Sequence, residues 1–346
     1  MAGKPILLGS TLPELEQVAA ALAMPRYAAR QIASWLYGQR VADFAAMSNL
    51  SAAHRAALAE RYALGRYAPA AVQASRDGTT KLLFAPPDGQ GAGVEAVLIP
   101  EEGRATLCVS SQAGCRMGCR FCMTARMGFG RHLAAGEMLN QLFSAAGSER
   151  LTNLVLMGMG EPLDNLEEVL RFLAVATAPW GMGWSPTRIT LSTVGLLPAL
   201  RRFLDESRCQ LAISLHSPFA DERQALMPAQ RAHPIADVLS LLRRYRWEGQ
   251  RRVSFEYIML AGVNDSPRHA AALAAMLGGL SCRVNLLHFH QIPDSEFRSS
   301  PPSVIDGFRT MLAQRGLSTT VRTSRGEDIG AACGMLATQQ GASLQT

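Results

Sequence analysis

The chain has 346 residues, 48% of them hydrophobic, and a formal net charge of +6; this composition excludes a disordered chain and permits a buried core. The excess of Lys and Arg permits a polyanionic partner without demanding one. No apolar run approaches membrane-spanning length and no signal peptide stands at the start, so we expect a cytoplasmic protein whose thiols stay reduced.

The first part of the chain predicts helices. Apolar residues recur at helical spacing over 12–22, where Thr11 and Glu14 form a capping-box pattern. A second amphipathic pattern covers 27–38, and one or two short helices follow over 43–62. We expect a helical accessory domain over residues 1–64. Its arginines could together contact phosphates, although each alone fits a solvated surface; they are Arg26, Arg30, Arg40, Arg55 and Arg61.

Two further regions follow the helical domain. Short apolar runs separated by Asp, Gly and Pro predict a β-hairpin linker over residues 65–103. Strand-like runs then alternate with helical patterns over residues 104–340, which favours βαβ units and a complete or partial barrel of six or seven units. The strand-like runs are residues 105–111, 151–158, 187–193, 209–216, 252–260, 283–290 and 318–324.

Chemically reactive residues follow the predicted strands directly. Three cysteines come after the first run, "GMGEP" after the second, "STVG" after the third and "SLHSP" after the fourth. Barrels of this class carry their chemistry in loops at the carboxyl ends of the strands. The pattern therefore predicts one active site at that end of the barrel.

Three cysteines lie within residues 115–122, in the spacing Cys115-x3-Cys119-x2-Cys122. A structural zinc ion takes four N or S ligands, so the fourth would come from Cys108, Cys333 or a histidine. A [4Fe-4S] cluster bound by three cysteines keeps one iron free for a substrate or cofactor. The spacing favours a cluster over zinc, a disulfide or chance.

This spacing, with Phe121 before the last cysteine, resembles the signature of radical S-adenosylmethionine enzymes. Longer stretches are similar to the RlmN/Cfr family of RNA-methylating radical enzymes, in order over nearly the whole chain. The resemblance implies a partial (βα)6-type radical S-adenosylmethionine barrel with an RNA-binding helical domain. The stretches are "RATLCVSSQAGCRMGCRFCMTARMGFGRHL", "LMGMGEPLDN", "ITLSTVGLLP", "AISLHSP", "YIMLAGVND" and "RGEDIGAACGML".

The resemblance also implies the cofactors and their binding residues. Cys115, Cys119 and Cys122 match the ligands of a [4Fe-4S] cluster, and two molecules of S-adenosylmethionine would be used per turnover. Individually, a Gly-Glu turn or a serine at a strand end is common without any ligand. The positions that match S-adenosylmethionine contacts are Gly160, Glu161, Ser192, Ser214, Leu215, His216 and His290.

Three further residues match a cysteine relay. Cys333 matches the thiol that receives a methyl group, and Cys108 matches a resolving thiol that forms a transient disulfide with it. Glu95 matches the general base that removes a ring proton from adenine; without the resemblance it would be interpreted as an exposed strand residue.

The chain departs from the family pattern at two places. It has Met227-Pro228-Ala229-Gln230 where the family usually has Met-Pro-Ile-Asn, and "HFHQ" where the family usually has Pro-Trp-Asn-Pro. His290 thus stands where an asparagine contacts S-adenosylmethionine, and an imidazole can still form a hydrogen bond.

The leading hypothesis is an RNA methyltransferase acting at C2 of an adenosine in large-subunit ribosomal RNA, with tRNA as a second candidate substrate. An electron donor such as flavodoxin or ferredoxin would reduce the cluster, and no membrane is involved. The nearest alternative is C8 methylation of adenosine, or another RNA target. A metal-stabilised RNA-binding protein without catalysis and a radical enzyme acting on a small molecule are the alternatives from other classes.

Overall fold

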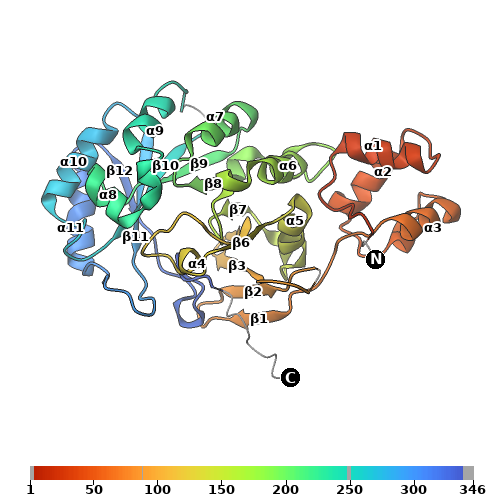
Figure 1. The fold of residues 1–346 in the computed structure, drawn as a ribbon, viewed down its shortest axis with the longest axis horizontal. Helices are drawn as coiled ribbons and strands as arrows, with labels where there is room; N and C mark the ends of the chain where they lie inside the picture. The colour runs from red at the N-terminus through yellow and green to blue at the C-terminus, as the bar shows by residue number, and fades with distance from the viewer. Residues whose placement is uncertain (1–3, 88, 248–250, 338–346) are drawn as a thin grey trace.

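The computed structural model describes residues 4–87, 89–247 and 251–337, and a curved sheet with helices outside it forms its main body (Figure 1). The ten described strands of this sheet run in the order β1-β2-β3-β4-β7-β8-β9-β10-β11-β12. From β4 onward all neighbours are parallel. These strands are β4 (Arg104–Cys108), β7 (Asn153–Leu156), β8 (Ile189–Thr193), β9 (Gln210–Ser214), β10 (Val253–Met259), β11 (Cys282–His288) and β12 (Ser318–Val321).

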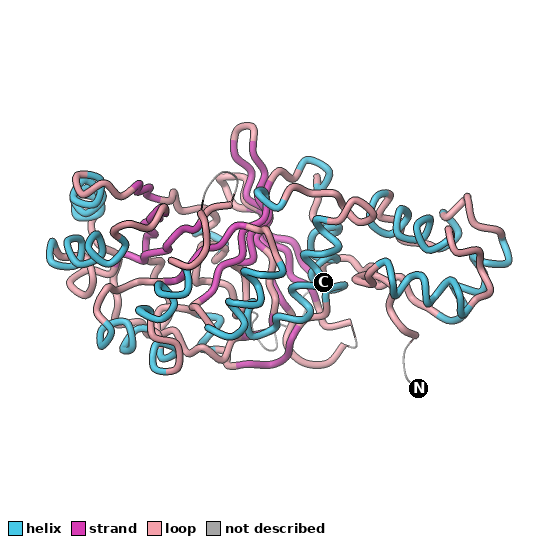
Figure 2. Tube along the Cα trace, turned by 90° about the horizontal axis from the view of Figure 1, so that it is seen from above, coloured by secondary structure: helices cyan, strands magenta, loops and turns pink. Residues whose placement is uncertain are grey.

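Helices connect the parallel strands and cover their outer face, as Figure 2 shows from above. The predicted partial barrel is confirmed, with β12 as a further parallel strand beyond the sixth. The final positions of the predicted catalytic domain, 338–340, lie outside the described residues. The covering helices are α5 (Ala135–Ser144), α6 (Leu166–Thr177), α7 (Leu197–Glu206), α8 (Ala220–Leu226), α9 (Ile235–Leu242), α10 (Pro267–Leu277) and α11 (Pro302–Ala313).

Alternation along the strands separates a helix-facing side from an interior side. On β10, the Tyr257 ring packs on Phe308 of α11 with centroids 5.4 Å apart, so Tyr257 faces outward. Its neighbour Glu256 therefore points into the barrel. The register aligns Ser214, Glu256, Asn285 and Thr320 in one interior row across β9 to β12. Polar residues in this row line the barrel interior rather than its packed outer face.

The predicted helical region is also confirmed. It contains α1 (Leu12–Ala21), α2 (Ala28–Ala33), the π-helix η1 (Ser34–Gly38), the short 3-10 helix η2 (Phe44–Ala46) and α3 (Ala52–Arg61). At the start of α1 the Glu14 carboxylate accepts a hydrogen bond from the backbone N–H of Thr11 at 2.7 Å, as the capping pattern predicts. These helices lie to one side of the barrel (Figure 1).

The helical region packs tightly against the barrel helices. The Tyr37 hydroxyl donates to the backbone oxygen of Ser10, and its ring meets Trp180 edge-on at 6.0 Å. Gly9 and Gly136 approach so closely that a Cβ on Gly9 would lie 2.5 Å from the Gly136 nitrogen. The two regions therefore share one continuous apolar core.

The strands of the predicted hairpin linker extend the same sheet. They are β1 (Ala71–Ala74), β2 (Thr80–Phe84) and β3 (Val94–Glu101), and all pair antiparallel. Because β3 also pairs antiparallel with β4, the hairpin forms one edge of the barrel sheet. None of the helices in the described ranges is long and apolar enough to cross a membrane.

Candidate active site

The predicted site residues gather at the carboxyl ends of the parallel strands. Cys108 is the last residue of β4, Ser214 is the last residue of β9, and Ser192 is the next-to-last residue of β8. Glu161 follows β7, and His290 follows β11. Parallel strands end at the same edge of the sheet, so residues far apart in sequence share one region.

A small hairpin and a short helix flank the cysteine loop. The hairpin consists of β5 (Gln112–Gly114) and β6 (Phe129–His132), and the helix is α4 (Met123–Arg126). The Cys115 N–H donates to the Gly128 oxygen at 2.8 Å, and the Cys122 N–H donates to the Cys119 oxygen at 3.2 Å. The loop is therefore fixed at both ends by backbone hydrogen bonds.

The environment of the cysteines disfavours free thiolates. Burial raises the pKa of the Cys115 thiol to about 12 and places that of Cys119 well above its usual value. Negative charge on the neighbouring cysteines raises both values further. Bound cations reverse this effect, because a coordinated thiol gives up its proton.

The three cysteines of the loop are the candidate ligands of a cluster. In a [4Fe-4S] cluster each cysteine binds a different iron. Cys115, Cys119 and Cys122 lie on one loop, within electrostatic range of one another. They could hold a cluster at three of its irons.

Glu161 is a buried carboxylate beside this loop. Its Oε1 accepts from the Leu163 N–H at 3.0 Å and its Oε2 from the Val194 N–H at 2.9 Å. Burial raises the pKa of Glu161 to about 7. No Lys, Arg or His in the described part of the chain forms an ion pair with it. A ligand ammonium group would supply the missing positive charge, which fits the amino group of S-adenosylmethionine.

Gly160 places Glu161 against Gln112 of β5. Its φ is +102°, a backbone conformation that glycine adopts easily. A Cβ at this position would lie 2.5 Å from the Gln112 Cβ. The Gln112 Oε1 accepts a hydrogen bond from the Glu161 N–H at 2.8 Å. Glycine is thus required at position 160 by the close approach of its backbone to Gln112.

His216 ends the Ser-Leu-His stretch in an unusual conformation. Its φ is +60°, and its Nδ1 accepts from the Ile258 N–H at 3.0 Å. Burial lowers the pKa of His216 to about 3, so the imidazole stays neutral. Strained, buried residues of this kind are common at functional sites. Phe121 of the cysteine loop meets the imidazole edge-on at 4.8 Å.

Arg223 of α8 is a residue that sequence reasoning missed. It is fully buried, and it donates to the backbone oxygens of Val194, Ser214 and Leu215 at 2.9–3.1 Å. It therefore joins the ends of β8 and β9, where the predicted cofactor contacts lie. Its position in "ADERQAL" is typical of a solvated helix, so only tertiary packing reveals its burial.

The two departures from the family pattern have different surroundings. The Gln230 Oε1 accepts from Arg223 Nη1 at 2.5 Å and from the Ile235 N–H at 3.0 Å, so its amide serves a structural connection. His290 is buried, and its Nε2 lies 3.2 Å from the Ser324 hydroxyl. Burial lowers the pKa of His290, which Glu327 partly opposes.

The structure brings the three relay candidates into one region. The Glu95 carboxylate is buried, and its Oε2 accepts from the Ala337 N–H at 3.0 Å. Burial raises the pKa of Cys108 to about 12, and charge on nearby Cys333 raises it further. Cys333 is exposed to solvent at the surface. Many protein atoms nevertheless surround its thiol, and their desolvating effect raises the pKa of Cys333.

The segment carrying Cys333 is attached to the cysteine loop. The Met123 N–H donates to the Gly334 oxygen at 2.8 Å, and the Thr124 hydroxyl donates to the Leu336 oxygen at 2.7 Å. Both donors follow Cys122 directly. The C-terminal segment therefore connects the predicted cluster loop to Glu95.

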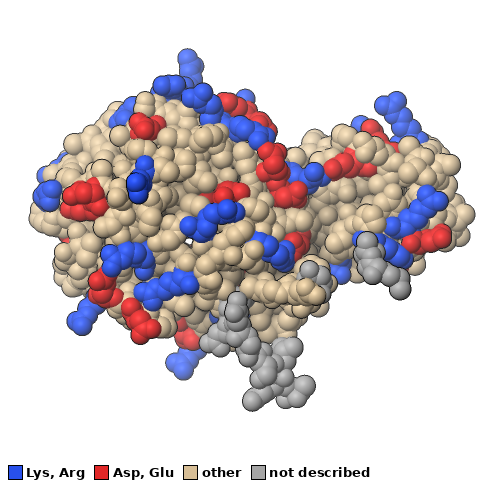
Figure 3. Space-filling view, in the orientation of Figure 1, with Lys and Arg blue, Asp and Glu red and all other residues tan. Residues whose placement is uncertain are grey.

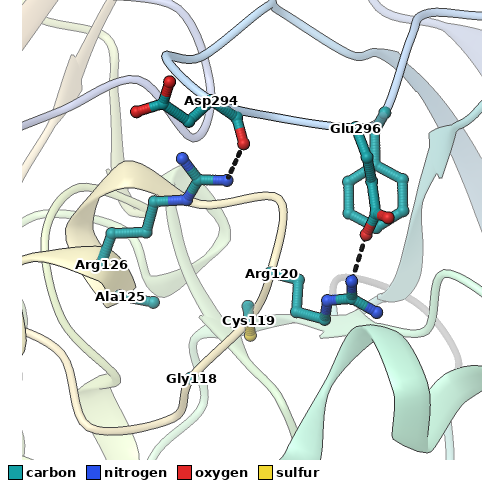
Figure 4. A pocket seen from close by; sticks show the side chains of 8 residues that line it. Gly118, Cys119, Arg120, Ala125, Arg126, Asp294 and Glu296 are labelled. Atoms are coloured by element: carbon teal, nitrogen blue, oxygen red, sulfur yellow. Dashed lines mark hydrogen bonds and ion pairs between the residues drawn. The ribbon is translucent and has the colours of Figure 1, made fainter.

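A pocket of about 450 Å³ lies at the cysteine loop (Figure 4). Arg120 pairs with Glu296, and Arg126 donates to backbone oxygens of Pro293 and Asp294. On the face shown in Figure 3, Lys and Arg are spread over both the barrel and the helical domain with Asp and Glu among them. The pocket is lined by Gly118, Cys119, Arg120, Ala125, Arg126, Asp294, Glu296 and Phe297.

Comparisons with known proteins identify the family. Residues 109–274 match the Radical SAM superfamily, and residues 6–64 match the ribosomal RNA large subunit methyltransferase N-terminal domain. The chain is 56% identical over 342 residues to a probable dual-specificity RNA methyltransferase RlmN from Porphyromonas gingivalis, covering 99% of this chain and 96% of that protein. It is 41% identical to the dual-specificity RNA methyltransferase RlmN of Syntrophotalea carbinolica, covering 94% and 88%.

A solved structure is also similar. The crystal structure of a radical SAM methyltransferase from Sphaerobacter thermophilus matches with a TM-score of 0.90 and 44% identity, covering 96% of this chain and 99% of that one. The agreement extends over the helical region, the sheet and the cysteine loop together. The chain therefore belongs to the RlmN family of radical S-adenosylmethionine RNA methyltransferases.

Proposed function

We propose that this protein methylates C2 of adenosine in large-subunit ribosomal RNA and in tRNA, through a methylated cysteine. One observation carries the proposal. The cysteine loop, the unpaired carboxylate of Glu161 and the group Glu95, Cys108 and Cys333 meet at the same end of the barrel. The names of the relatives, which describe dual-specificity RNA methyltransferases, support the two RNA substrates.

The chemistry of the target explains the need for these residues. Adenine C2 lies between two ring nitrogens and is electrophilic, so it cannot attack a methylsulfonium directly. A [4Fe-4S] cluster and S-adenosylmethionine would supply a methyl group and a radical that abstracts hydrogen. Cys115, Cys119 and Cys122 would hold the cluster, and Glu161 would bind the ammonium group of S-adenosylmethionine.

The chain supplies the remaining steps. Cys333 accepts the methyl group as a thiolate nucleophile, and its solvent access lets an RNA base approach it. After hydrogen is abstracted from the methyl group on Cys333, its carbon bonds to adenine C2 as a radical. Glu95 takes the C2 proton, and one electron would leave the adduct for the cluster, which restores the aromatic ring. Cys108 then attacks the Cys333 sulfur, and the bond between that sulfur and the bridging carbon breaks as the Cys108–Cys333 disulfide forms. The electron pair of the broken bond stays with the carbon, which takes up a proton to become the new methyl group of the released RNA.

Partner molecules follow from this chemistry. RNA is the substrate, and the arginines of the helical domain offer contacts to its phosphates. A one-electron donor such as flavodoxin or ferredoxin would reduce the cluster. Ser192, Ser214, Leu215, His216 and His290 would complete the S-adenosylmethionine site.

Nucleoside mass spectrometry of ribosomal RNA and tRNA from a deletion strain tests the proposal. We expect 2-methyladenosine to disappear from both RNAs and to return with a plasmid copy. Loss of 8-methyladenosine instead would favour the C8 alternative, and unchanged RNA would contradict both. Anaerobic purification separates the other classes, because about four irons per chain support the enzyme and one zinc supports a metal-stabilised binding protein.

A further inference from the structure

Lys81 lies beside the proposed general base. It is on β2, and Glu95 is on the neighbouring strand β3. The register pairs Lys81 with Val97 and Leu83 with Glu95, so Lys81 and Glu95 are diagonal neighbours on one face of the sheet. The Lys81 Nζ lies 3.2 Å from the Glu95 Oε1, and both side chains are largely buried, at 14% and 7% exposed.

We propose that Lys81 is a positioning residue for Glu95, which keeps this carboxylate ionised and directed toward the RNA base. The proposal rests on the function proposed above, in which Glu95 takes the C2 proton.

Lys81 is the residue whose positive charge can keep the Glu95 carboxylate ionised. Among residues of the described ranges, Lys81 is the one cation that forms an ion pair with Glu95. A buried carboxylate without a cation takes up a proton, and a protonated carboxyl group cannot act as a base. Burial raises the pKa of Glu95, while Lys81 and the Ala337 N–H oppose this effect.

The backbone of Glu95 is fixed independently of Lys81. The Ser110 hydroxyl donates to the backbone oxygen of Glu95 at 2.5 Å, and the backbone N–H of Glu95 donates to the Met159 sulfur at 3.3 Å. These contacts hold the strand whatever residue stands at position 81. Lys81 therefore acts on the carboxylate, and its replacement should leave the strand in place.

The turn before Lys81 is attached to the C-terminal segment. The Asp77 Oδ2 accepts from the Gly326 N–H at 2.9 Å, and the Ser75 hydroxyl donates to the Asp328 Oδ1 at 2.6 Å. A Cβ on Gly330 would lie 3.7 Å from the Lys81 Nζ. The Ala337 N–H also donates to Glu95. Together these contacts hold Lys81, Glu95 and the segment that carries Cys333 in fixed positions relative to one another.

The test is the pH dependence of RNA methylation by the reconstituted holoenzyme, with Lys81→Met, Lys81→Gln, Lys81→Arg and Glu95→Gln. We expect Lys81→Met to lose about tenfold or more in rate near pH 7 and to recover as the pH rises, because one unit of pKa corresponds to a factor of ten. Lys81→Arg keeps the charge and should stay near the wild-type profile. Glu95→Gln should lose activity at every pH.

Matched controls separate this role from a structural one. Lys4→Met removes an exposed lysine whose Nζ donates to a backbone oxygen, and it should leave the profile unchanged. Lys81→Gln provides a second neutral variant if Lys81→Met does not fold, as judged by melting temperature and iron content. An unshifted profile, or an equal loss at all pH values in a folded neutral variant, overturns the proposal for Lys81.

Failure of the underlying function gives a different result. If the wild type does not methylate RNA, or if Glu95→Gln is fully active, the assignment of Glu95 as the base is wrong and the role of Lys81 falls with it. If the wild type and Glu95→Gln behave as expected while both neutral Lys81 variants keep the wild-type profile, the proposed role of Lys81 alone is wrong.

Discussion

At the scale of single residues, Glu161 has a protonation state that folding changes strongly. Its pKa rises from the usual 4.5 to about 7 because it is buried. The folded state therefore binds the proton more tightly than the unfolded state does, and stability from this group is fully present below pH 4.5. This contribution of Glu161 to the free energy of unfolding is lost as the pH rises through 7, and the loss is at most about 3 kcal/mol.

Glu161→Gln should remove this pH dependence. In the cluster-free protein, we expect the wild type to lose about 1–3 kcal/mol more unfolding free energy between pH 5 and pH 8 than the variant loses. Urea titrations at the two pH values measure the difference. Equal losses in both proteins would contradict the buried, unpaired state of the carboxylate. Asp164→Asn is a nearby control, because the Asp164 carboxylate already pairs with Arg116.

Gly160→Ala tests the close approach at the Gly-Glu turn. A methyl group there would meet Gln112 at 2.5 Å in a left-handed backbone conformation, so we expect a loss of about 2–4 kcal/mol and weaker S-adenosylmethionine binding. Gly183→Ala is the matched control, since its φ is +66° and no atom lies within 4 Å of an added Cβ. Thermal unfolding and ligand titration measure both effects. A Gly160→Ala variant no less stable than the control would argue against the contact.

Functional residues that form a motif with fixed spacing could be predicted from the sequence. Single residues that reach the site only through tertiary contacts could not. The three cysteines stand within one short loop, so their pattern is visible without a structure. Lys81 meets Glu95 only through a diagonal across two strands, and Arg223 is buried only because the ends of β8 and β9 surround it. Contacts of this kind depend on register and packing, which a single sequence does not specify.

At the scale of elements, α8 differs from an ordinary surface helix because Arg223 points inward. Arg223→Met would remove donors from the Val194, Ser214 and Leu215 oxygens. We expect a loss of about 3 kcal/mol or more, because buried acceptors would be left without partners. Chemical denaturation of the cluster-free protein measures this loss.

Arg202 of α7 provides the matched control for Arg223. It is exposed and pairs with Glu167 and Glu206, so Arg202→Met should change stability far less than Arg223→Met does. Equal effects of the two substitutions would contradict the role of Arg223 in joining the strand ends.

Long apolar runs made the parallel strands predictable, whereas the β5–β6 hairpin was not predicted. Its strands Gln112–Gly114 and Phe129–His132 are short and flank the cysteine loop. Their pairing depends on the loop between them, which brings Cys115 to Gly128. The two strands also lack the apolar alternation by which strands are usually recognised.

At the scale of the whole molecule, the helical domain and the barrel form one continuous core, while the positive charge is distributed over both. Arg26 and Arg30 are exposed on the helical domain. If the domain contacts RNA phosphates, the double variant Arg26→Ala/Arg30→Ala should reduce the slope of log affinity against log salt by about 2 units. Filter binding at several salt concentrations measures the slope. Arg309→Ala on α11 is the control, and a double variant with the wild-type slope would exclude these contacts.

The overall architecture was predictable because motifs and apolar periodicity agree along the whole chain. The continuity of the hairpin strands with the barrel sheet was not, because strand pairing between β3 and β4 joins segments predicted as separate regions. The meeting of Cys108, Cys333 and Glu95 also requires the C-terminal segment to return across the barrel.

The covalent connection between Cys333 and RNA is the central claim, and the Cys108→Ala holoenzyme tests it most directly. Without the resolving thiol, the methylene-bridged adduct should persist. Mass spectrometry of the digested complex should then show an adenosine joined through one carbon to the peptide containing Cys333. An adduct on another residue, or full RNA methylation by Cys108→Ala with no adduct at any time, would contradict the cysteine relay.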